Sequence, residues 1–566
     1  MAALAAAPLL LLGLGGAPFD DPGEGMHAQI ARELAVSGDP LRLTLAGVPY
    51  VDKPPLLYVL VAGAVALGGA REAAARAVPA LAAVLAVAAV AWLGARLLGA
   101  RAGVLAGLAL LASCGFFAYG RYLRPDALFV AALAVGFALA LVGLAERRPA
   151  LTMLGLAAFG LAGLAKDPLG ALVPPLVIAF AVAVSGDVRV PRGWQPWAGG
   201  LALGALGIGW YAAAALARPG FAWYTLVDNH VLNIARMRAF PDEDVPLGAA
   251  AFLAVALIGA VPWTLTAGAM IWRLARRRAW ADAAERPWVA LSLWVIAVLG
   301  FTVLSPFRLP HYGLPAYPAV ALLAARGWRD LPWRPLACAH ALVLGALGLV
   351  CGVAWMAGGA RVIETVVVAT DVATRKSALA GTAAPVPAAV AFAPLLGAVA
   401  LTLGLGALTL AALAVSPARD VERRRWAAAL VVVATLLATL PSVASGLALV
   451  ASHRAVKAIA LEVARRAAPD DVVTHEGPIE NSGALEWYGG RRPVIVDGRR
   501  SVLGFAATLP GTATTFWDAA RLDVAWRSGQ RVWLVTARPP ELSLAAGLPG
   551  ARLVATGGGR RLYVNR

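Results

Sequence analysis

The sequence is short of charged residues and rich in apolar ones. Only 14% of its 566 residues are charged, whereas 60% are hydrophobic. A soluble globular chain is about one-quarter charged, so this composition excludes an ordinary soluble protein. A helix needs roughly 20 apolar residues to cross a bilayer, and such runs recur over residues 1–450. The sequence therefore predicts a polytopic α-helical membrane protein.

Cysteine and acidic residues are also scarce. The chain has three cysteines, Cys114, Cys338 and Cys351, and no pair of them has the spacing of a metal site. Each lies in an apolar run, which indicates inert core residues. The 49 basic residues outnumber the 32 acidic ones. This balance is typical of nucleic-acid binding, but membrane proteins also collect arginine in cytoplasmic loops. We favour the second interpretation, with no nucleic acid as a partner.

Arginine recurs in every second loop between the apolar runs. The positive-inside rule places these basic loops in the cytoplasm and the loops between them outside. The apolar run at 55–70 would break this alternation; because it is short and follows Pro54-Pro55, we interpret it as a helix at the outer interface. About 13 spans then remain, with a cytoplasmic N-terminus. The basic loops hold residues 96–101, 147–148, 189–192, 273–278, 326–334 and 419–425.

The character of the chain changes after residue 450. Helical periodicity predicts a helix over 453–467, and short apolar segments between turn residues predict strands. Two domains are expected: a membrane domain over 1–450, whose first outer loop is 19–75, and a soluble extracytoplasmic α/β domain over 451–566. The predicted strands lie at 470–477, 492–498, 531–537 and 561–566.

The predicted outer loops gather many acids, bases and histidines on one face of the membrane. An ionisable group beside lipid is costly unless it is paired or used, so the grouping indicates a functional site. A transporter or lipid flippase is the alternative, but the charges stand outside the spans and no internal repeat is present, unlike in many transporters. The grouped residues include Asp20, Asp21, Glu24, His27, Asp52, Lys53, Arg124, Asp126, Lys166, Asp167, Asp228, His230, Arg236, Arg238, Arg308, His311 and Tyr312.

Several outer loops resemble, in order, the motifs of one family. The motifs are DPGEGMHAQIAREL and VDKPPLLY in the first loop, then RYLRPDALF, GLAKDPLG, LVDNHVLNIARMRAF and SPFRLPHYG. They are similar to the aminoarabinose lipid A transferases and the related protein O-mannosyltransferases of glycosyltransferase family 39. This resemblance implies the GT-C fold and an inner-membrane enzyme that uses a polyprenyl-phosphate-linked sugar. The acceptor would be lipid A, a protein or a surface glycan on the outer side.

The resemblance also implies roles for single residues. Lys53 matches the lysine that binds the donor phosphate, and Asp126 would pair with it. Asp52 and His230 match a carboxylate and an imidazole that hold a divalent metal, which would be zinc, manganese or magnesium. The further residues assigned to the donor phosphate are Arg124, Arg236, Arg308 and Tyr312.

The first loop departs from the family pattern at its acidic pair. Where the family has an Asp followed by a Glu, this sequence has Gly23 followed by Glu24. The presumed catalytic carboxylate is therefore missing from its place. Asp21 and Glu24 are the candidates to take over the role of base, and the sequence leaves the choice between them open.

Overall fold

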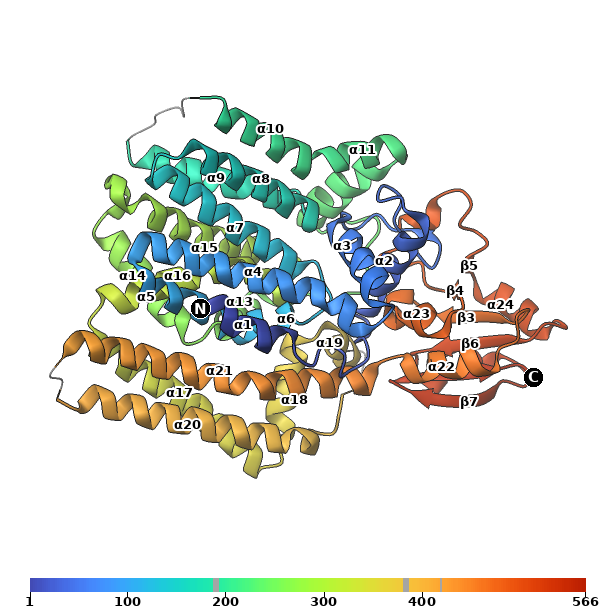
Figure 1. Cartoon of the computed structure of the whole chain (residues 1–566). Coiled ribbons are helices and arrows are strands. Elements are labelled where there is room, and N and C mark those ends of the chain that lie inside the picture. The colour runs from blue at the N-terminus through green and yellow to red at the C-terminus, as the bar shows by residue number, and fades with distance from the viewer. Residues whose placement is uncertain (187–192, 380–385, 418–419) are drawn as a thin grey trace.

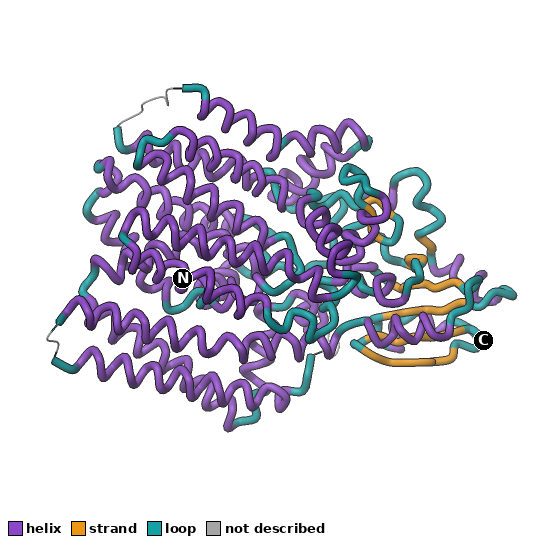
Figure 2. The backbone as a smooth tube through the Cα atoms, in the orientation of Figure 1, coloured by secondary structure: helices purple, strands orange, loops and turns teal. Residues whose placement is uncertain are grey.

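The computed structural model describes residues 1–186, 193–379, 386–417 and 420–566. Helices fill the first part of the chain, and a mainly parallel sheet with its own helices forms the C-terminal part (Figures 1 and 2). The two parts lie end to end. The first loop, with α2 and α3, lies between the bundle and the sheet (Figure 1).

The first half of the bundle includes a two-stranded ribbon in the first loop. Its elements are α1 (Ala2–Leu11), α2 (Gly25–Ser37), β1 (Thr44–Leu45), β2 (Val48–Pro49), α3 (Leu56–Gly68), α4 (Glu72–Leu98), α5 (Ala100–Leu111), α6 (Cys114–Gly120), α7 (Asp126–Ala145), α8 (Pro149–Ala165), α9 (Leu169–Val184), α10 (Gln195–Gly207) and α11 (Gly209–Ala217).

The second half begins with a π-helix and ends with a long helix that runs up to the C-terminal part. Its elements are η1 (Trp223–Leu232), α12 (Asn233–Ala235), α13 (Ala249–Ile258), α14 (Trp263–Arg276), η2 (Ala279–Ala281), η3 (Ala283–Glu285), α15 (Arg286–Leu304), η4 (Pro310–Ala316), α16 (Tyr317–Asp330), α17 (Trp333–Met356), α18 (Ala360–Thr370), α19 (Val372–Leu379), η5 (Ala389–Phe392), α20 (Ala393–Val415) and α21 (Val421–Arg454).

The helical membrane fold is confirmed, but the number of spans is not. In the described ranges, seven helices are long and apolar enough to cross a bilayer, or nine if each of two bent pairs counts as one. The bent pairs are α5 with α6, at 68°, and α13 with α14, at 104°. Helices α1, α3, α8 and α9 are apolar but shorter. The count of about 13 spans therefore stays a prediction.

Small residues let the central helices approach one another closely. A Cβ on Gly136 of α7 would lie 2.4 Å from the ring of Phe159 on α8. That ring packs edge-on against Phe137, with ring centroids 5.2 Å apart. Van der Waals packing of this kind holds helices together in lipid, where the hydrophobic effect between helices is absent.

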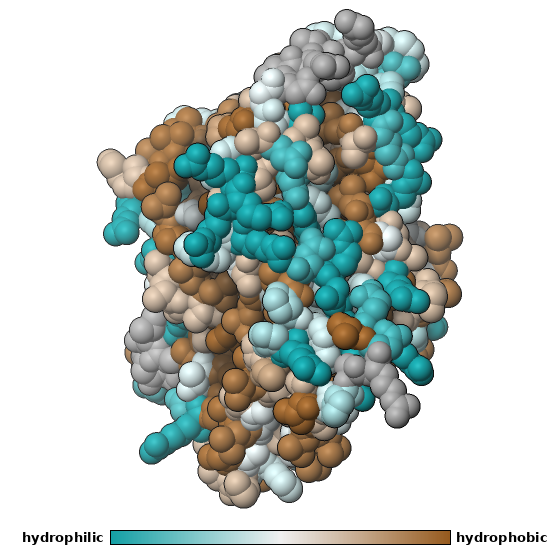
Figure 3. Space-filling view, turned by 90° about the vertical axis from the view of Figure 1, so that its left-hand side faces the viewer, coloured by the Kyte–Doolittle hydropathy of each residue, from teal (hydrophilic) through white to brown (hydrophobic). Residues whose placement is uncertain are grey.

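Polar side chains gather on the end of the bundle opposite the C-terminal sheet, the end that faces the viewer in Figure 3. Ion pairs join neighbouring loops: Arg96 contacts Glu146, and Arg326 lies 2.5 Å from Glu285. These two ion pairs therefore join loops that the sequence analysis placed on one side of the membrane.

The C-terminal part is an α/β domain, as predicted. Its sheet has the strand order β5-β4-β3-β6-β8-β7; β5, β4, β3 and β6 are parallel, and β8 runs antiparallel to both of its neighbours. The four predicted strands correspond to β3, β4, β6 and β8, and the predicted helix corresponds to α22. The elements are α22 (Lys457–Arg466), β3 (Val472–Glu476), η6 (Ile479–Ser482), α23 (Leu485–Gly489), β4 (Val494–Val496), η7 (Ala506–Thr508), β5 (Phe516–Trp517), α24 (Ala519–Arg527), β6 (Val532–Thr536), η8 (Pro540–Leu542), η9 (Leu544–Gly547), β7 (Arg552–Gly557) and β8 (Arg560–Val564).

Candidate functional site

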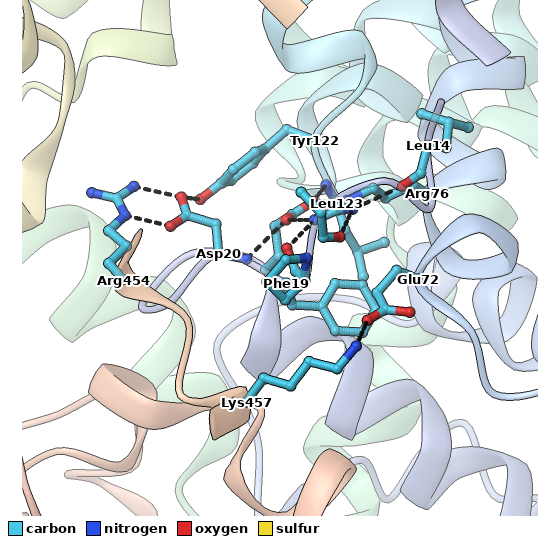
Figure 4. A network of polar contacts seen from close by, with 12 residues as sticks. Leu14, Phe19, Asp20, Glu72, Arg76, Tyr122, Leu123, Arg454 and Lys457 are labelled. Carbon is cyan, nitrogen blue, oxygen red and sulfur yellow. Dashed lines mark hydrogen bonds and ion pairs between the residues drawn. The ribbon is translucent and has the colours of Figure 1, made fainter. Parts of the chain in front are cut away.

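Glu24, one of the two predicted bases, is the centre of a buried network at the first loop. Its carboxylate accepts hydrogen bonds from Arg76 on α4, at 2.8 and 2.5 Å, and from the backbone N–H groups of Leu123 and Asp20, at 2.8 and 3.0 Å. Arg76 also donates to the carbonyls of Leu14, Ala17 and Pro18 (Figure 4). Both oxygens of Glu24 are therefore engaged in holding the loop against the bundle.

Asp20 is engaged in the same way on the other side of the loop. Its carboxylate faces the guanidinium of Arg454, at the end of α21, and accepts a 2.6 Å hydrogen bond from the hydroxyl of Tyr122 (Figure 4). The phenol of Tyr122 also fills the space beside Gly23: a Cβ at that position would lie 2.0 Å from the hydroxyl oxygen. This contact gives a structural reason for the glycine where the resemblance expected an aspartate.

Asp21, the other predicted base, joins the first loop to the C-terminal domain. Its two oxygens accept hydrogen bonds from the backbone N–H groups of Val456 and Ala484, both at 3.2 Å. The side chain is buried. Burial raises the pKa of Asp21 to about 6, against the nearby charge of Arg560, which lowers it. Both oxygens are therefore occupied by backbone groups of the domain that packs on the loop.

A cavity of about 1790 Å³ opens between the bundle and the C-terminal domain. One wall consists of small and aliphatic side chains from α13 and α21, a surface suited to lipid. The polar wall includes the first loop, the segment 242–244 and Glu480 of the C-terminal domain. Asp20, Asp21 and Glu24 all line this cavity, so the first loop contributes to the site as expected.

Lys53 has a partner other than the expected one. Its ammonium contacts the carboxylate of Asp52 at 2.6 Å. Asp126 instead binds Lys166, with 2.5 Å between the ammonium nitrogen and the carboxylate oxygen. The prediction that Asp126 pairs with Lys53 is therefore wrong, because Asp126 pairs with Lys166, which comes from the loop between α8 and α9. Lys53 keeps a partly exposed ammonium.

Arg124 connects this cation cluster with the cavity. Its Nε lies 3.5 Å from a carboxylate oxygen of Asp126, and its side chain lines the cavity. In the described part of the chain, no hydrogen-bond acceptor contacts its terminal nitrogens. The ring of Tyr312 packs under the ammonium of Lys166, at 5.2 Å from the ring centroid. Arg124, Asp126, Lys166 and Tyr312 thus form one partly buried group, and the charge of Lys53 acts on Lys166. We call these five residues the cation cluster.

The two predicted metal ligands have separate partners. His230 directs Nε2 at Asp167, with 3.3 Å between nitrogen and oxygen, whereas Asp52 is bound to Lys53. The hydrogen bond to Asp167 raises the pKa of His230. Burial favours neutral Asp52, but the charge and hydrogen bond of Lys53, together with the charges of Arg238 and His27, outweigh it and lower the pKa of Asp52. Within the described ranges, no three His, Cys, Asp or Glu side chains are grouped as metal ligands would be. Metal binding stays a prediction.

Arg236 and Arg308 lie outside the cation cluster. Arg236 has a left-handed backbone conformation, with φ of 59°, and an exposed side chain. Arg308 donates to the carbonyls of Ser305 and Pro306 in its own loop, at 2.6 and 3.2 Å. It also precedes η4, so it does not sit one helical turn from Tyr312 as expected. These are the two predicted phosphate contacts that the structure does not bring to the cluster.

Sequence reasoning assigned no role to three components of the site. The only sequence signal for a role of Lys166 in the site was the acidic residue next to it. Arg238, two residues after Arg236, lies 3.5 Å from Asp228 and 3.4 Å from Asp242. The acidic segment 242–244 lines the cavity. The run Asp-Glu-Asp in an outer loop was the available signal, but only the fold places it beside Arg124.

Comparison with known proteins supports the resemblance. Residues 52–228 match the family model described as dolichyl-phosphate-mannose-protein mannosyltransferase. Undecaprenyl phosphate-alpha-4-amino-4-deoxy-L-arabinose arabinosyl transferase of Aeromonas salmonicida is 27% identical over 60% of this chain and 62% of its own length. A similarly named protein of Sodalis glossinidius, numbered 2, is 31% identical over 54% and 55%. The chain thus spans about three-fifths of the length of the first of these relatives.

A solved structure matches the whole chain. The crystal structure of ArnT from Cupriavidus metallidurans bound to undecaprenyl phosphate has a TM-score of 0.80 at 22% identity, over 100% of this chain and 97% of that one. Its apo state matches with a TM-score of 0.79. The GT-C fold and the resemblance to these glycosyltransferases are therefore confirmed. The chain is a multi-pass inner-membrane protein with this fold.

Proposed function

We propose that the chain is an integral-membrane glycosyltransferase that takes a sugar from a polyprenyl-phosphate donor and transfers it to a lipid acceptor. The observation that carries the proposal is the cation cluster: Arg124 lines a cavity with an apolar wall, and the charges of Arg124 and Lys53 both act on Lys166. Cations suit the phosphate of the donor, and the apolar wall suits its polyprenyl chain. The match with a fold that binds undecaprenyl phosphate supports the same donor.

The cation cluster supplies the electrostatics that the reaction needs. An acceptor oxygen attacks the anomeric carbon from the face opposite the phosphate, and the bond between that carbon and the phosphate oxygen breaks. The electron pair of the broken bond leaves on polyprenyl phosphate. Preorganised cations stabilise charge where it develops, and Arg124 lines the cavity where the leaving phosphate would lie. Lys166 holds Asp126, which in turn positions Arg124.

The sugar and the acceptor are narrower proposals. The relatives named for 4-amino-4-deoxy-L-arabinose make that sugar a candidate, and the matched family model makes mannose a second. Lipid A is the candidate acceptor by the resemblance. A divalent metal would be held by Asp52 and His230, with Asp167 as a neighbouring carboxylate. Such an ion would add positive charge near the donor phosphate.

The orientation in the membrane is also part of the proposal. The N-terminus and the basic end of the bundle would face the cytoplasm, and the cavity and the C-terminal domain would face the periplasm. The ion-paired arginine loops at the end opposite the sheet support this orientation. Labelling of single cysteines introduced at Arg101 and Arg552 with an impermeant reagent in whole cells tests it. Only the second should react.

The function is tested by transfer of tritiated sugar in proteoliposomes. The donors are polyprenyl-phosphate sugars extracted from labelled cells, and the acceptors are the extracted membrane lipids. Wild type should transfer label, and Lys53→Ala should reduce kcat/KM at least about thirtyfold, because a desolvated charge contact to the donor is worth about 2–5 kcal/mol. Arg101→Ala, at the opposite end of the bundle, is the matched control and should transfer normally.

Absence of transfer by the folded wild type from every donor in the pool would overturn the proposal. Lipid movement across the bilayer without transfer would replace it with the transporter or flippase alternative.

A further inference from the structure

The reaction needs a carboxylate beside the acceptor, and the acidic stretch 20–24 of the first loop has none with a free oxygen. Asp20 is bound to Arg454 and Tyr122, Asp21 to two backbone N–H groups, and Glu24 to Arg76 and two more. A carboxylate introduced at residue 23 would collide with Tyr122. The loop that carries the acidic pair in the related family is therefore committed to structure in this chain.

The acidic segment 242–244 also brings carboxylates to this cavity. Asp242 pairs with Arg238 at 3.4 Å, and Glu243 pairs with Lys376. Asp244 follows them, and no cation or hydrogen-bond donor contacts its carboxylate within the described ranges. Its side chain is exposed and lines the cavity. It is thus the member of the segment that remains open to a ligand.

The segment is anchored at both ends, so Asp244 has a defined position. The N–H of Ala239 donates to Asp228 at 2.6 Å, and the N–H of Leu247 donates to the carbonyl of Arg308 at 2.8 Å. Between these anchors, the N–H of Asp244 donates to the side chain of Asp242 at 3.1 Å. A carboxylate on such a loop is held for chemistry better than one on a mobile loop.

Asp244 lies among the groups that bind the donor. Its charge acts on Arg124 and on Tyr312 of the cation cluster, and on Glu480 from the C-terminal domain. The charged groups that act on Asp244 in turn are Asp242, Arg124, Lys376 and Asp52. Desolvation by the protein around it, followed by the charge of Asp242, raises the pKa of Asp244 to about 6, although solvent reaches the side chain. Burial also raises the pKa of Glu480 to about 8, which leaves this neighbour neutral at pH 7.

We propose that Asp244 is the catalytic base, which accepts the proton of a hydroxyl group on the acceptor as that oxygen attacks the anomeric carbon. This inference rests on the proposed function and deepens it. The new bond joins the acceptor oxygen to the anomeric carbon, the bond to the donor phosphate breaks, and the proton moves to the carboxylate of Asp244. A general base of this kind contributes about 10²–10⁴-fold to rate.

The same geometry selects the class of acceptor. A phosphate monoester is already anionic at pH 7 and needs no base, and the adjacent carboxylates of Asp242 and Asp244 would repel it. A hydroxyl group is neutral, and it gains a reactive oxygen only when a base takes its proton. The acceptor chemistry is therefore that of an alcohol, on a lipid or a lipid-linked glycan, and the product is a glycoside.

Three variants of the full-length protein test the role of Asp244 in the transfer assay described above. Asp244→Asn should lower kcat at least about a hundredfold and leave the affinity for undecaprenyl phosphate within twofold of wild type. Asp244→Glu should recover part of the activity. Asp470→Asn removes an exposed carboxylate of the C-terminal domain that does not line the cavity, and this variant should transfer normally.

The pH profile separates a base from a structural residue. Wild-type kcat/KM should fall as pH drops through about 6, because the base becomes protonated. Asp244→Asn should lose this dependence in its residual activity. Normal transfer by Asp244→Asn, or an equal loss in Asp21→Asn with an unchanged profile in Asp244→Asn, would overturn the role of Asp244 while the proposed function stands.

Acceptor chemistry is read from the product. Transfer should survive treatment of the acceptor lipids with alkaline phosphatase, and the labelled product should resist mild acid, as a glycoside does and a glycosyl phosphate does not. Loss of transfer after phosphatase treatment, or an acid-labile product, would show a phosphate acceptor and contradict the inference. Failure of the wild type to transfer at all would overturn the proposed function and this inference together.

Discussion

Two groups of charges lie where the bundle meets the C-terminal domain, and they differ in how completely they are paired. In the first loop, every carboxylate oxygen of Asp20, Asp21 and Glu24 accepts a hydrogen bond from an arginine, a tyrosine or a backbone N–H group. In the surrounding site, Arg124 and Asp244 face the cavity with atoms that no partner in the described residues takes up. Paired buried charges hold a fold together, whereas open ones are available to a ligand.

The largest expected effect comes from removing one partner of a buried ion pair in the first group of charges. Arg76→Ala leaves Glu24 buried without its cation and removes three hydrogen bonds to carbonyls of the first loop. Breaking a buried pair in this way costs about 3–5 kcal/mol. Thermal unfolding in detergent should show a large loss of stability. Arg96→Ala breaks an ion pair that is partly exposed and should cost at most about 1 kcal/mol; equal losses in the two variants would refute the distinction.

Substitutions in the second group of charges, those around the cavity, should change the transfer activity more than the stability of the fold. Lys166→Met removes the cation that holds Asp126, at the edge of the cation cluster. We expect kcat/KM for transfer to fall at least about tenfold, equivalent to about 1.4 kcal/mol. Lys166→Arg keeps the charge and should retain more activity. Arg423→Met, on an exposed stretch at the start of α21, controls for loss of a cation. Unchanged kinetics in Lys166→Met would exclude Lys166 from the site.

Gly23 tests whether packing excludes a side chain from the first loop. In Gly23→Ala the new methyl would lie 2.0 Å from the hydroxyl of Tyr122. Displacing that ring breaks its bond to Asp20, and overpacking of this kind costs about 1–3 kcal/mol. Thermal unfolding should show the loss, and Tyr122→Ala should remove the added cost. Gly200→Ala is the matched control, because nothing lies within 4 Å of the methyl it would add.

The smallest expected effect concerns the pH dependence of stability. Burial, with help from the charges of Arg124 and Lys53, lowers the pKa of His27 to about 3. The folded chain keeps this imidazole neutral, whereas the unfolded chain binds a proton near the ordinary value of 6.5. Stability should therefore be lost as pH falls below 6.5, by about 1 kcal/mol at pH 5.5.

His27→Gln isolates this contribution from the acids. Its glutamine still offers a hydrogen bond to Tyr58, which contacts the imidazole at 3.0 Å in the wild type. Buried acids with raised pKa values, such as Asp21, act in the opposite direction, so the difference between the two proteins is the quantity to measure. A wild-type curve parallel to that of the variant between pH 7 and 5.5 would contradict the buried, neutral state of His27.

The sequence determined the membrane fold, the C-terminal α/β domain and much of the donor side of the site. Long apolar runs have few alternatives to membrane helices, and alternation with turn residues marked four strands of the sheet. Lys53, Arg124, Asp126 and Tyr312 could be found because short motifs carry them. In the structure Arg124 contacts Asp126, and Lys166 contacts both Asp126 and Tyr312 and feels the charge of Lys53. The span count was harder to predict, because bent helices and short apolar helices do not follow a fixed length.

Only the tertiary structure decided which charges pair and which stay open. Asp126 binds Lys166 and not Lys53 because the loop after α8 folds back to the start of α7. Asp21 is occupied because Val456 and Ala484, more than 400 residues later, bring their N–H groups to it. A sequence does not distinguish a carboxylate whose oxygens are all hydrogen-bonded from one with an oxygen that has no partner. Its function depends on the donors around it, and those come from segments that only folding brings together.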